Sequence, residues 1–222
     1  QAPVLPTPGA VLLAAKLFAE ALGDVLVIDV GGATTDVHSV TEGSLEWTSR
    51  LTDPEPIAKR TVEGDLGVFV NAANILALAN DPDWEAEMTH LMAMPRTEQE
   101  MNLTRWLTKR AVETAIRRHA GQVSDLYTPS GKIKIVRGKD LTAVKWLVGT
   151  GGALTHLSGG EEILRGICMG AGQHLLPTPE TKVIIDGSYR FSALGTLAHH
   201  YPEEVKTTFV HWVQENHNLI KE

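Results

Sequence analysis

The sequence of 222 residues contains a single cysteine, Cys168. One cysteine excludes an internal disulfide framework and any zinc site that is built from several cysteines. A lone cysteine behaves more often as a small buried residue than as a nucleophile, so we expect Cys168 to lie in the core.

Long hydrophobic runs are also missing. The best apolar stretch is interrupted by Lys16 and Glu20, so it falls short of the roughly 18 residues that a membrane-spanning helix needs. The first residues do not show the charged region and apolar stretch of a signal peptide. We therefore expect no membrane association and a location in the cytoplasm.

A third absence concerns positive charge. The formal net charge is −7 and the isoelectric point is near 5.7, whereas proteins that bind nucleic acids usually carry a basic patch. We therefore expect no nucleic acid among the partners. The hydrophobic share of 43% is enough for one sizeable core or two closely joined subdomains.

The sequence does contain a strand, a glycine bend and a second strand, in residues 25–40 (VLVIDVGGATTDVHSV). Gly31 and Gly32 lack the Cβ atoms that would keep backbone amides away from an anion, so the bend can hold a phosphate group. Thr34 and Thr35 add hydroxyl donors beside the bend. A tight hairpin turn with surface aspartates explains the same residues, and both interpretations remain open at this point.

Two aspartates flank the bend. Asp29 ends an otherwise apolar strand and has no obvious role in a core. It could hold a hydrated Mg²⁺, because this ion usually keeps several waters and takes one or two carboxylates. Asp36 follows the threonines, and we expect it either to orient a water molecule or to brace the turn.

A second glycine segment occupies residues 144–154 (VKWLVGTGGAL) and leads into a predicted helix over residues 153–167. Since Leu154 stands where a dinucleotide fingerprint needs glycine, the segment is not of that type. The segment has little side-chain cover at Gly149, Thr150, Gly151 and Gly152, because three of these residues are glycines. These glycines either leave room for a ligand or let the strand and the helix pack closely.

The nine histidines do not form a metal motif. His199 and His200 are adjacent, and neighbouring residues of a helix point in different directions. His38 and His156 follow the two glycine segments, so either could approach a ligand, but we expect both to be hydrogen-bonded structural residues. No serine, histidine and aspartate have a spacing that indicates a hydrolase.

Four segments follow one another in a recognisable order. They are PGAVLLAA, VIDVGGATTDV, VGTGGAL and FSALGT, the last at residues 191–196. In this order they resemble the connect 1, phosphate 2, adenosine and connect 2 motifs of the actin-like ATPase superfamily. The resemblance implies an α/β fold, a ribonuclease H-like lobe with a mixed sheet flanked by helices and a helical insertion.

The same resemblance implies the ligands ATP or ADP and Mg²⁺. Asp29 would position the hydrated metal ion, the glycines and threonines of the bend would hold phosphates, and residues 149–152 would border the adenosine. The sequence offers no identifiable catalytic base, because in related ATPases that residue belongs to connect 1 or to the other lobe.

A narrower resemblance rests on LPTPGAVLLAAKL, DVGGATTDVHSV, KRTVEGDLG and LVGTGGALTHL. Together these segments are similar to the MutL (GlmL) family associated with glutamate mutase, which is unrelated to the mismatch-repair protein of that name. The resemblance implies an ATP-dependent factor that reactivates an adenosylcobalamin-dependent mutase or exchanges its cofactor. The alternatives are a small-molecule kinase of the same superfamily and a non-catalytic interaction module.

One motif of the superfamily is missing. A phosphate 1 hairpin of the D-x-G-x-x-x-T type should precede connect 1, and residues 1–8 leave no room for it. We therefore expect this chain to be the C-terminal half of a longer protein. Hydrolysis by the chain alone should be weak or absent, since phosphoryl transfer relies on donors and metal on both sides of the phosphates.

The resemblance to the actin-like superfamily implies three parts: residues 1–82 with connect 1 and phosphate 2, a helical insertion over 83–126, and residues 127–222 with the adenosine and connect 2 segments. Such an insertion is a natural place for a partner protein to dock. Predicted helices cover residues 9–22, 66–79, 192–200 and 203–216, and predicted strands cover 25–30, 35–40, 45–49, 132–136 and 182–186. Thr97 and Glu100 have the spacing of a capping box.

Overall fold

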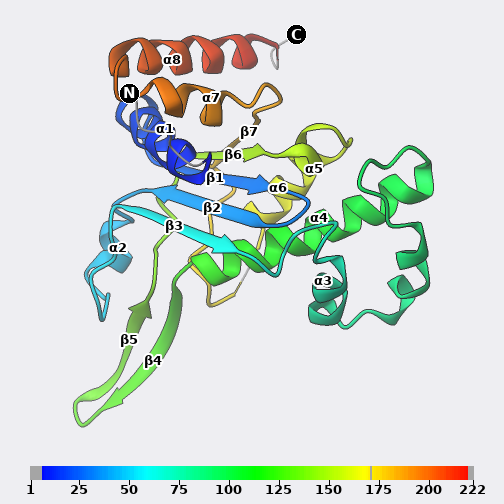
Figure 1. Cartoon of the computed structure of the whole chain (residues 1–222). Coiled ribbons are helices and arrows are strands. Elements are labelled where there is room, and N and C mark those ends of the chain that lie inside the picture. Colours follow the sequence, from blue (N-terminus) through cyan, green and yellow to red (C-terminus); the bar gives the residue numbers. More distant parts are fainter. Residues whose placement is uncertain (1–6, 171, 220–222) are drawn as a thin grey trace.

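The computed structural model describes residues 7–170 and 172–219. Its centre is a five-stranded sheet in the order β3-β2-β1-β6-β7 (Figure 1). The strands of this sheet are β1 (Val25–Val30), β2 (Thr35–Val40), β3 (Ala58–Glu63), β6 (Trp146–Thr150) and β7 (Lys182–Ile185). A separate hairpin, made of β4 (Gln122–Thr128) and β5 (Gly131–Arg137), projects away from the sheet.

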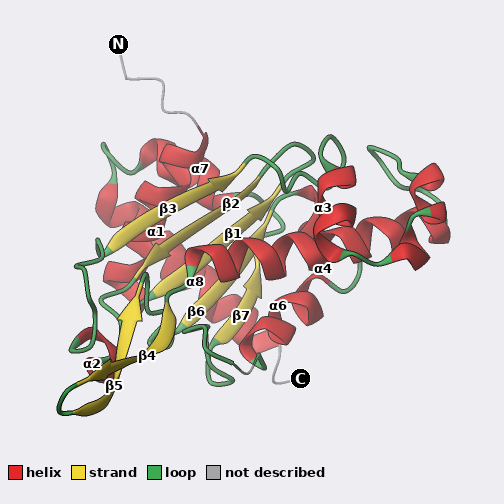
Figure 2. Ribbon diagram, turned by 90° about the horizontal axis from the view of Figure 1, so that it is seen from below, coloured by secondary structure: helices red, strands yellow, loops and turns green. Residues whose placement is uncertain are grey.

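Helices cover both faces of the sheet (Figures 1 and 2). One face carries α1 (Thr7–Leu22), α7 (Arg190–Leu197) and α8 (Pro202–Leu219), and the other carries α4 (Glu98–His119) and α6 (Gly160–Cys168). Short helices occupy the connections: α2 (Leu45–Thr48), α3 (Ala72–Ala79), η1 (Pro82–Trp84), η2 (Ala86–His90) and α5 (Gly152–Thr155). The prediction of a mixed sheet flanked by helices is confirmed.

The strand directions place three strand ends side by side. β2 is antiparallel to both β1 and β3, whereas β1, β6 and β7 run parallel. The carboxyl ends of β1, β6 and β7 therefore meet at one edge, which we call the strand-end edge. Ligands of open α/β sheets bind outside the carboxyl ends of parallel strands, so this edge is the first place to look for a site.

Alternation along β1 assigns its side chains to two cores. Leu26, Ile28 and Val30 pack with residues of α4 and α6, whereas Val25 and Val27 pack with residues of α1, α7 and α8. Since successive side chains of a strand point to opposite faces, Asp29 points to the α1 and α7 side.

Helix α4 is part of the main core. Leu103, Leu107 and Ile116 of this helix are fully buried in the same cluster as Leu26 and Ile28 of β1. The sequence between residues 83 and 126 therefore stabilises the sheet itself through α4. The division of the chain into three parts stays a prediction of the sequence.

Helices α1 and α7 cross at very close range. A Cβ atom on Gly195 would overlap the backbone of Ala10, its carbonyl oxygen included. A glycine is therefore required where α7 crosses α1. The segments that the sequence identified as connect 1 and connect 2 thus lie side by side on one face of the sheet.

The third predicted strand, at residues 45–49, is wrong. These residues form α2, where the Ser44 hydroxyl accepts a hydrogen bond from the Trp47 amide and caps the helix. The strand that pairs with β2 is β3, whose sequence AKRTVE alternates charged and apolar residues only weakly. Three antiparallel strands in succession are nevertheless present.

Three predicted helices have different bounds. The helix predicted from residue 66 begins at Ala72 and is preceded by turns. The helix predicted over 153–167 is split into α5 and α6 at Gly159, whose φ of 94° favours glycine. The end of the predicted insertion is not helical, because residues 122–128 form β4.

Several predictions of local structure are confirmed. β1 and β2 have the predicted bounds, and Thr97 and Glu100 form the capping box of α4. Cys168 is 5% exposed, and burial raises the pKa of its thiol to about 11, as expected of a core residue rather than a nucleophile. Among the described residues, no helix combines the length and the apolar character needed to cross a bilayer.

Candidate functional site

Three aspartates lie at the strand-end edge. Asp29 of β1 stands opposite Asp36 of β2 and opposite Thr150 of β6 in the sheet register. Asp186 directly follows β7, and its charge acts on Asp29. The structure therefore brings together two aspartates that the sequence predicted and a third that it did not.

The negative charges of Asp36 and Asp186 repel that of Asp29. The pKa of Asp29 is raised to about 6, first by burial and then by the negative charges of Asp36 and Asp186. Burial also raises the pKa of Asp36, although the Thr34 hydroxyl partly offsets it by donating to Asp36 Oδ2 at 3.0 Å. Asp36 Oδ1 is buried with no hydrogen-bond partner in the described part of the chain. A bound cation would relieve this repulsion.

Asp186 has its two oxygens aimed at the start of α7. They accept the amides of Arg190 and Phe191 at 2.9 and 3.0 Å. The sequence reasoning missed this residue, although a signal was present. Ile185, Asp186 and Gly187 repeat the pattern of an apolar strand, an aspartate and a glycine that singled out Asp29.

The hairpin between β1 and β2 ends in a tight bend, residues 31–34, which we call the tip. The Gly31 amide donates to the Thr34 carbonyl at 2.9 Å and closes the bend. Thr34 and Thr35 differ in direction: the Thr34 hydroxyl contacts Asp36, whereas the buried Thr35 hydroxyl donates to the Leu66 carbonyl at 2.7 Å. Thr35 therefore anchors the tip from the α4 side of the sheet.

The tip is held by the segment of residues 64–71, which we call the bracing segment. The carbonyl of Gly31 accepts the Val68 amide, and the carbonyl of Gly32 accepts the amides of Phe69 and Val70. The Asn71 side chain donates to the Ala33 carbonyl at 2.8 Å. All these contacts use carbonyl groups of the tip, so they do not use the amides of Gly32 and Ala33.

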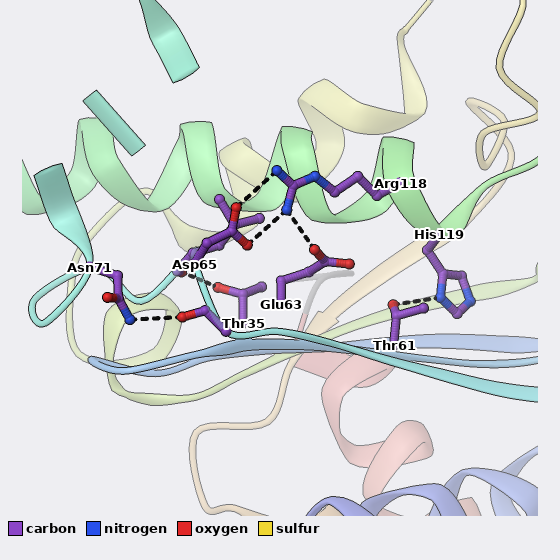
Figure 3. A network of polar contacts seen from close by, with 9 residues as sticks. Thr35, Thr61, Glu63, Asp65, Asn71, Arg118 and His119 are labelled. Atoms are coloured by element: carbon purple, nitrogen blue, oxygen red, sulfur yellow. Dashed lines mark hydrogen bonds and ion pairs between the residues drawn. The ribbon is translucent and has the colours of Figure 1, made fainter. Parts of the chain in front are cut away.

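Arg118 of α4 fixes this segment in turn (Figure 3). Its guanidinium donates to Glu63 at 2.6 Å and to both oxygens of Asp65 at 2.8 and 3.0 Å. These bonds hold the pKa of Asp65 below its usual value. Arg118 therefore ties the end of β3 and the start of the bracing segment to the main helix.

The second glycine segment lies beside Asp29. Gly151 has φ 87° and ψ 150°, a conformation that is essentially restricted to glycine. A Cβ atom on Gly149 would lie 2.7 Å from Leu164 Cδ1, so this glycine serves close packing. Thr150 is 4% exposed. Gly152 has room for a Cβ atom, since the nearest atom would be His156 Cδ2 at 3.6 Å.

A cavity of about 270 Å³ opens next to Gly32 and Gly152. It lies between the tip, the start of α4, and α5. Its walls are mainly apolar, and they include Val30, Val68, Phe69, Met92, Met94, Met101, Thr104, Ala153 and His156. Predominantly apolar walls with a few polar groups are typical of small-molecule sites.

The two candidate histidines have different surroundings. His156 borders the cavity, and its Nε2 lies 3.1 Å from the Tyr189 hydroxyl, as a hydrogen-bonded residue should. His38 is fully buried on the α1 side of β2, and neither ring nitrogen has a hydrogen-bond partner among the described residues. The expectation of a hydrogen-bonded His38 is therefore wrong.

The aspartates fit a metal ion that retains its waters. Within residues 7–170 and 172–219, no group of three His, Cys, Asp or Glu residues is arranged to hold a metal ion directly. Mg²⁺ does not need such a cage, since it is commonly held through one or two carboxylates and its own waters. The repulsion at Asp29 and the unpartnered oxygen of Asp36 suit that mode of binding.

Comparisons with known proteins point to a single family. A family model described as MutL protein matches residues 1–213. Protein MutL of Clostridium tetanomorphum is 38% identical over 226 residues, which cover 90% of this chain and 49% of that relative. The chain thus spans about half the length of the curated relative that it matches.

Proposed function

The chain belongs to the MutL protein family, and from this premise we propose that it is the nucleotide-binding lobe of an ATP-dependent factor. The factor serves an adenosylcobalamin-dependent mutase such as glutamate mutase, which it reactivates or supplies with fresh cofactor. The fold of the lobe is actin-like. Three antiparallel strands followed by parallel ones, with the connect 1 and connect 2 helices in contact, support this assignment.

The observation that carries the proposal is a pair of successive glycines between a carboxylate and a cavity. Asp29 lies against Gly151, the next residue is Gly152, and Gly152 lines the cavity. Bare backbone therefore joins a metal-suited carboxylate to an apolar pocket. A nucleotide has the matching order of parts: metal-bound phosphates, ribose and a flat base.

Asp29 positions the metal ion in this proposal. Asp36 and Asp186 repel its carboxylate and disfavour its charged form. A nearby cation has the opposite effect and favours the charged form. When bound, hydrated Mg²⁺ neutralises phosphate charge. Asp29 would orient the waters of that ion, and the Thr34 hydroxyl, which donates to Asp36, would hold that second carboxylate in place.

The tip receives the phosphates. The amides of Gly32 and Ala33 are not used by the bracing contacts, and successive amides of a bend can form an anion-binding nest. The bracing segment and Thr35 hold the tip in place before a ligand arrives, which lowers the cost of binding. Gly31 closes the bend that exposes these amides.

The cavity receives the adenine base. Phe69, Met92 and Met101 supply apolar contact, and Thr104 and His156 offer polar groups at the wall. Gly151, Gly152 and Thr150 border the ribose.

Turnover requires the whole protein. Because the chain spans about half of its curated relative, we assign the opposite wall of the nucleotide groove to the other half. Closure of two lobes over ATP would change their affinity for the mutase, which requires different nucleotide contacts in the open and closed states. We assign the junction with the other half to helices α1 and α7, which cross at Ala10 and Gly195.

A reactivation assay tests the proposal. The longer family protein is added to a purified mutase that has lost activity, with ATP, with ADP and without nucleotide. ATP-dependent recovery that is absent in an Asp29→Asn variant supports the proposal. Phosphoryl transfer to a small acceptor, without any effect on the mutase, would favour a kinase instead.

A further inference from the structure

The hairpin β4–β5 stands apart from the body of the molecule (Figures 1 and 2). It is attached at its base on both sides: the Val123 amide donates to the Gln173 carbonyl at 2.8 Å, and the Val136 amide donates to the Arg50 carbonyl at 2.9 Å. Beyond these contacts, residues 124–134 are almost entirely exposed. The outer part of the hairpin thus adds little to the core.

This outer part carries apolar side chains in water. Leu126 and Ile133 face each other across the strands and are 44% and 48% exposed. Tyr127 lies on the other face and is 77% exposed. Exposed apolar residues gathered on a projecting element indicate a surface that another molecule covers.

The hairpin is also basic, in a chain whose formal charge is −7. Residues 122–137 contain Lys132, Lys134 and Arg137 but a single acidic residue, Asp125. Lys132 is paired with Asp125 at 2.9 Å and lies 5.9 Å from the ring of Tyr127. Lys132 and Lys134 therefore lie on the face of the hairpin that carries Tyr127, and Leu126 and Ile133 lie on the opposite face.

We propose that this hairpin is a docking arm for an acidic protein surface. On one face of the arm, its lysines meet carboxylates of the partner and Tyr127 enters an apolar pocket beside them. The pair Leu126 and Ile133 packs against the partner on the other face. Charge complementarity of this kind selects a partner and speeds its approach. The inference rests on the proposed function, in which the acidic surface belongs to the mutase.

The composition of the arm favours protein over nucleic acid. Protein β-ribbons that bind nucleic acids carry extended basic patches that neutralise many phosphates. Here the cations are few, and one of them is already paired with Asp125. The apolar pair on one face offers nothing to a phosphate backbone, whereas aromatic and apolar anchors with basic neighbours are common at protein interfaces.

The test uses the longer family protein and the purified mutase, with affinity measured at low and high salt. The arm variant Lys132→Glu/Lys134→Glu is compared with Lys145→Glu/Lys182→Glu, which changes the net charge equally at exposed lysines at the amino ends of β6 and β7. We expect the arm variant to weaken binding at least tenfold at low salt and the control less than twofold. A third variant, Tyr127→Ser, should weaken binding at both salt concentrations.

Each other outcome has a distinct meaning. If the unmodified protein binds the mutase and the arm variants bind equally well, the docking arm is refuted and the proposed function stands. If the unmodified protein does not bind the mutase, the proposed function fails together with the arm. The unmodified protein could instead bind single-stranded RNA, with this binding lost in the arm variant and kept in the control variant. That outcome would overturn the proposal and identify a nucleic acid as the partner of the arm.

Discussion

Gly151 lies so close to Asp29 that a Cβ atom at position 151 would stand 2.5 Å from Asp29 Oδ1. The adenosine segment and the metal-suited carboxylate are therefore built against each other. Two features require glycine at position 151. A side chain would overlap Asp29, and a φ of 87° disfavours any other residue. This contact joins two sequence motifs that are more than a hundred residues apart.

A glycine pair tests this contact. We expect Gly151→Ala to lower the free energy of unfolding by about 1–3 kcal/mol, because backbone strain and the overlap with Asp29 act together. Gly152→Ala is the matched control, since its Cβ atom would meet only ordinary contacts, and it should stay within about 0.5 kcal/mol. Urea titrations of both variants measure their free energies of unfolding. Equal free energies would contradict the claim that a side chain at position 151 overlaps Asp29.

Asp29 should reduce the stability of the ligand-free chain. Its pKa rises from 3.8 to about 6 in the folded protein, so the folded state binds the proton more tightly, and stability from this group falls as the pH rises from about 4 to about 6. The full difference corresponds to at most about 3 kcal/mol above pH 6. Asp29→Asn should therefore stabilise the chain at pH 7 and abolish binding of Mg²⁺-nucleotide.

Unfolding at pH 7 and at pH 4 measures the effect of Asp29→Asn. The stabilisation by this variant should be present at pH 7 and nearly absent at pH 4. A variant that is less stable than the natural chain at pH 7 would show that the carboxylate is stabilised by its surroundings, contrary to the repulsion described here.

Two buried histidines should act in the opposite direction. Burial lowers the pKa of His38 to about 4 and that of His119 to about 3. The unfolded chain takes up protons near pH 6.5 while the folded chain does not, so stability is lost as the pH falls from about 6.5 to about 4. His38→Leu should reduce this loss of stability at acid pH.

The same histidines differ in their hydrogen bonds. His38 has no partner among the described residues, whereas His119 contacts the hydroxyls of Ser39 at 2.8 Å and Thr61 at 2.9 Å. At pH 7 we expect His38→Leu to be neutral or stabilising and His119→Leu to cost about 1–3 kcal/mol, because two hydroxyls lose their partner. Thermal unfolding of both variants decides, and equal losses would contradict the assignment of His38 as unpartnered.

The crossing of α1 and α7 gives another matched pair. Gly195→Ala should cost about 1–3 kcal/mol, because the added methyl group overlaps the backbone of Ala10. Gly166→Ala, within α6, meets no atom within 4 Å and should gain about 0.5–1 kcal/mol through helix propensity. If Gly195→Ala were as stable as Gly166→Ala, the two helices would be able to separate at no cost.

The strands next to the site were predictable because their signals are local. β1 is apolar apart from Asp29 and β2 begins directly after the glycine bend, so both bounds follow from the sequence. β3 was missed because it is an edge strand with exposed charges. The sequence pattern predicts a strand at residues 45–49, but Ser44 is placed to cap a helix there.

The sequence predicts which residues form the site but not the directions in which their side chains point. Two threonines in sequence suggested two phosphate ligands, yet Thr35 is turned to the Leu66 carbonyl on the other side of the strand. The repulsion between Asp29, Asp36 and Asp186 depends on strand register and burial, which the linear sequence does not state. The cavity depends on the packing of the segment before α4 against α5.

The most direct test of the account is a calorimetric titration with ADP and Mg²⁺, performed on this chain and on the longer family protein. We expect one site that is lost in Asp29→Asn and kept in His38→Leu, since His38 lies away from the cavity. Binding of equal strength in Asp29→Asn, or no binding by either protein, would contradict the claim that the strand-end edge holds an adenine nucleotide.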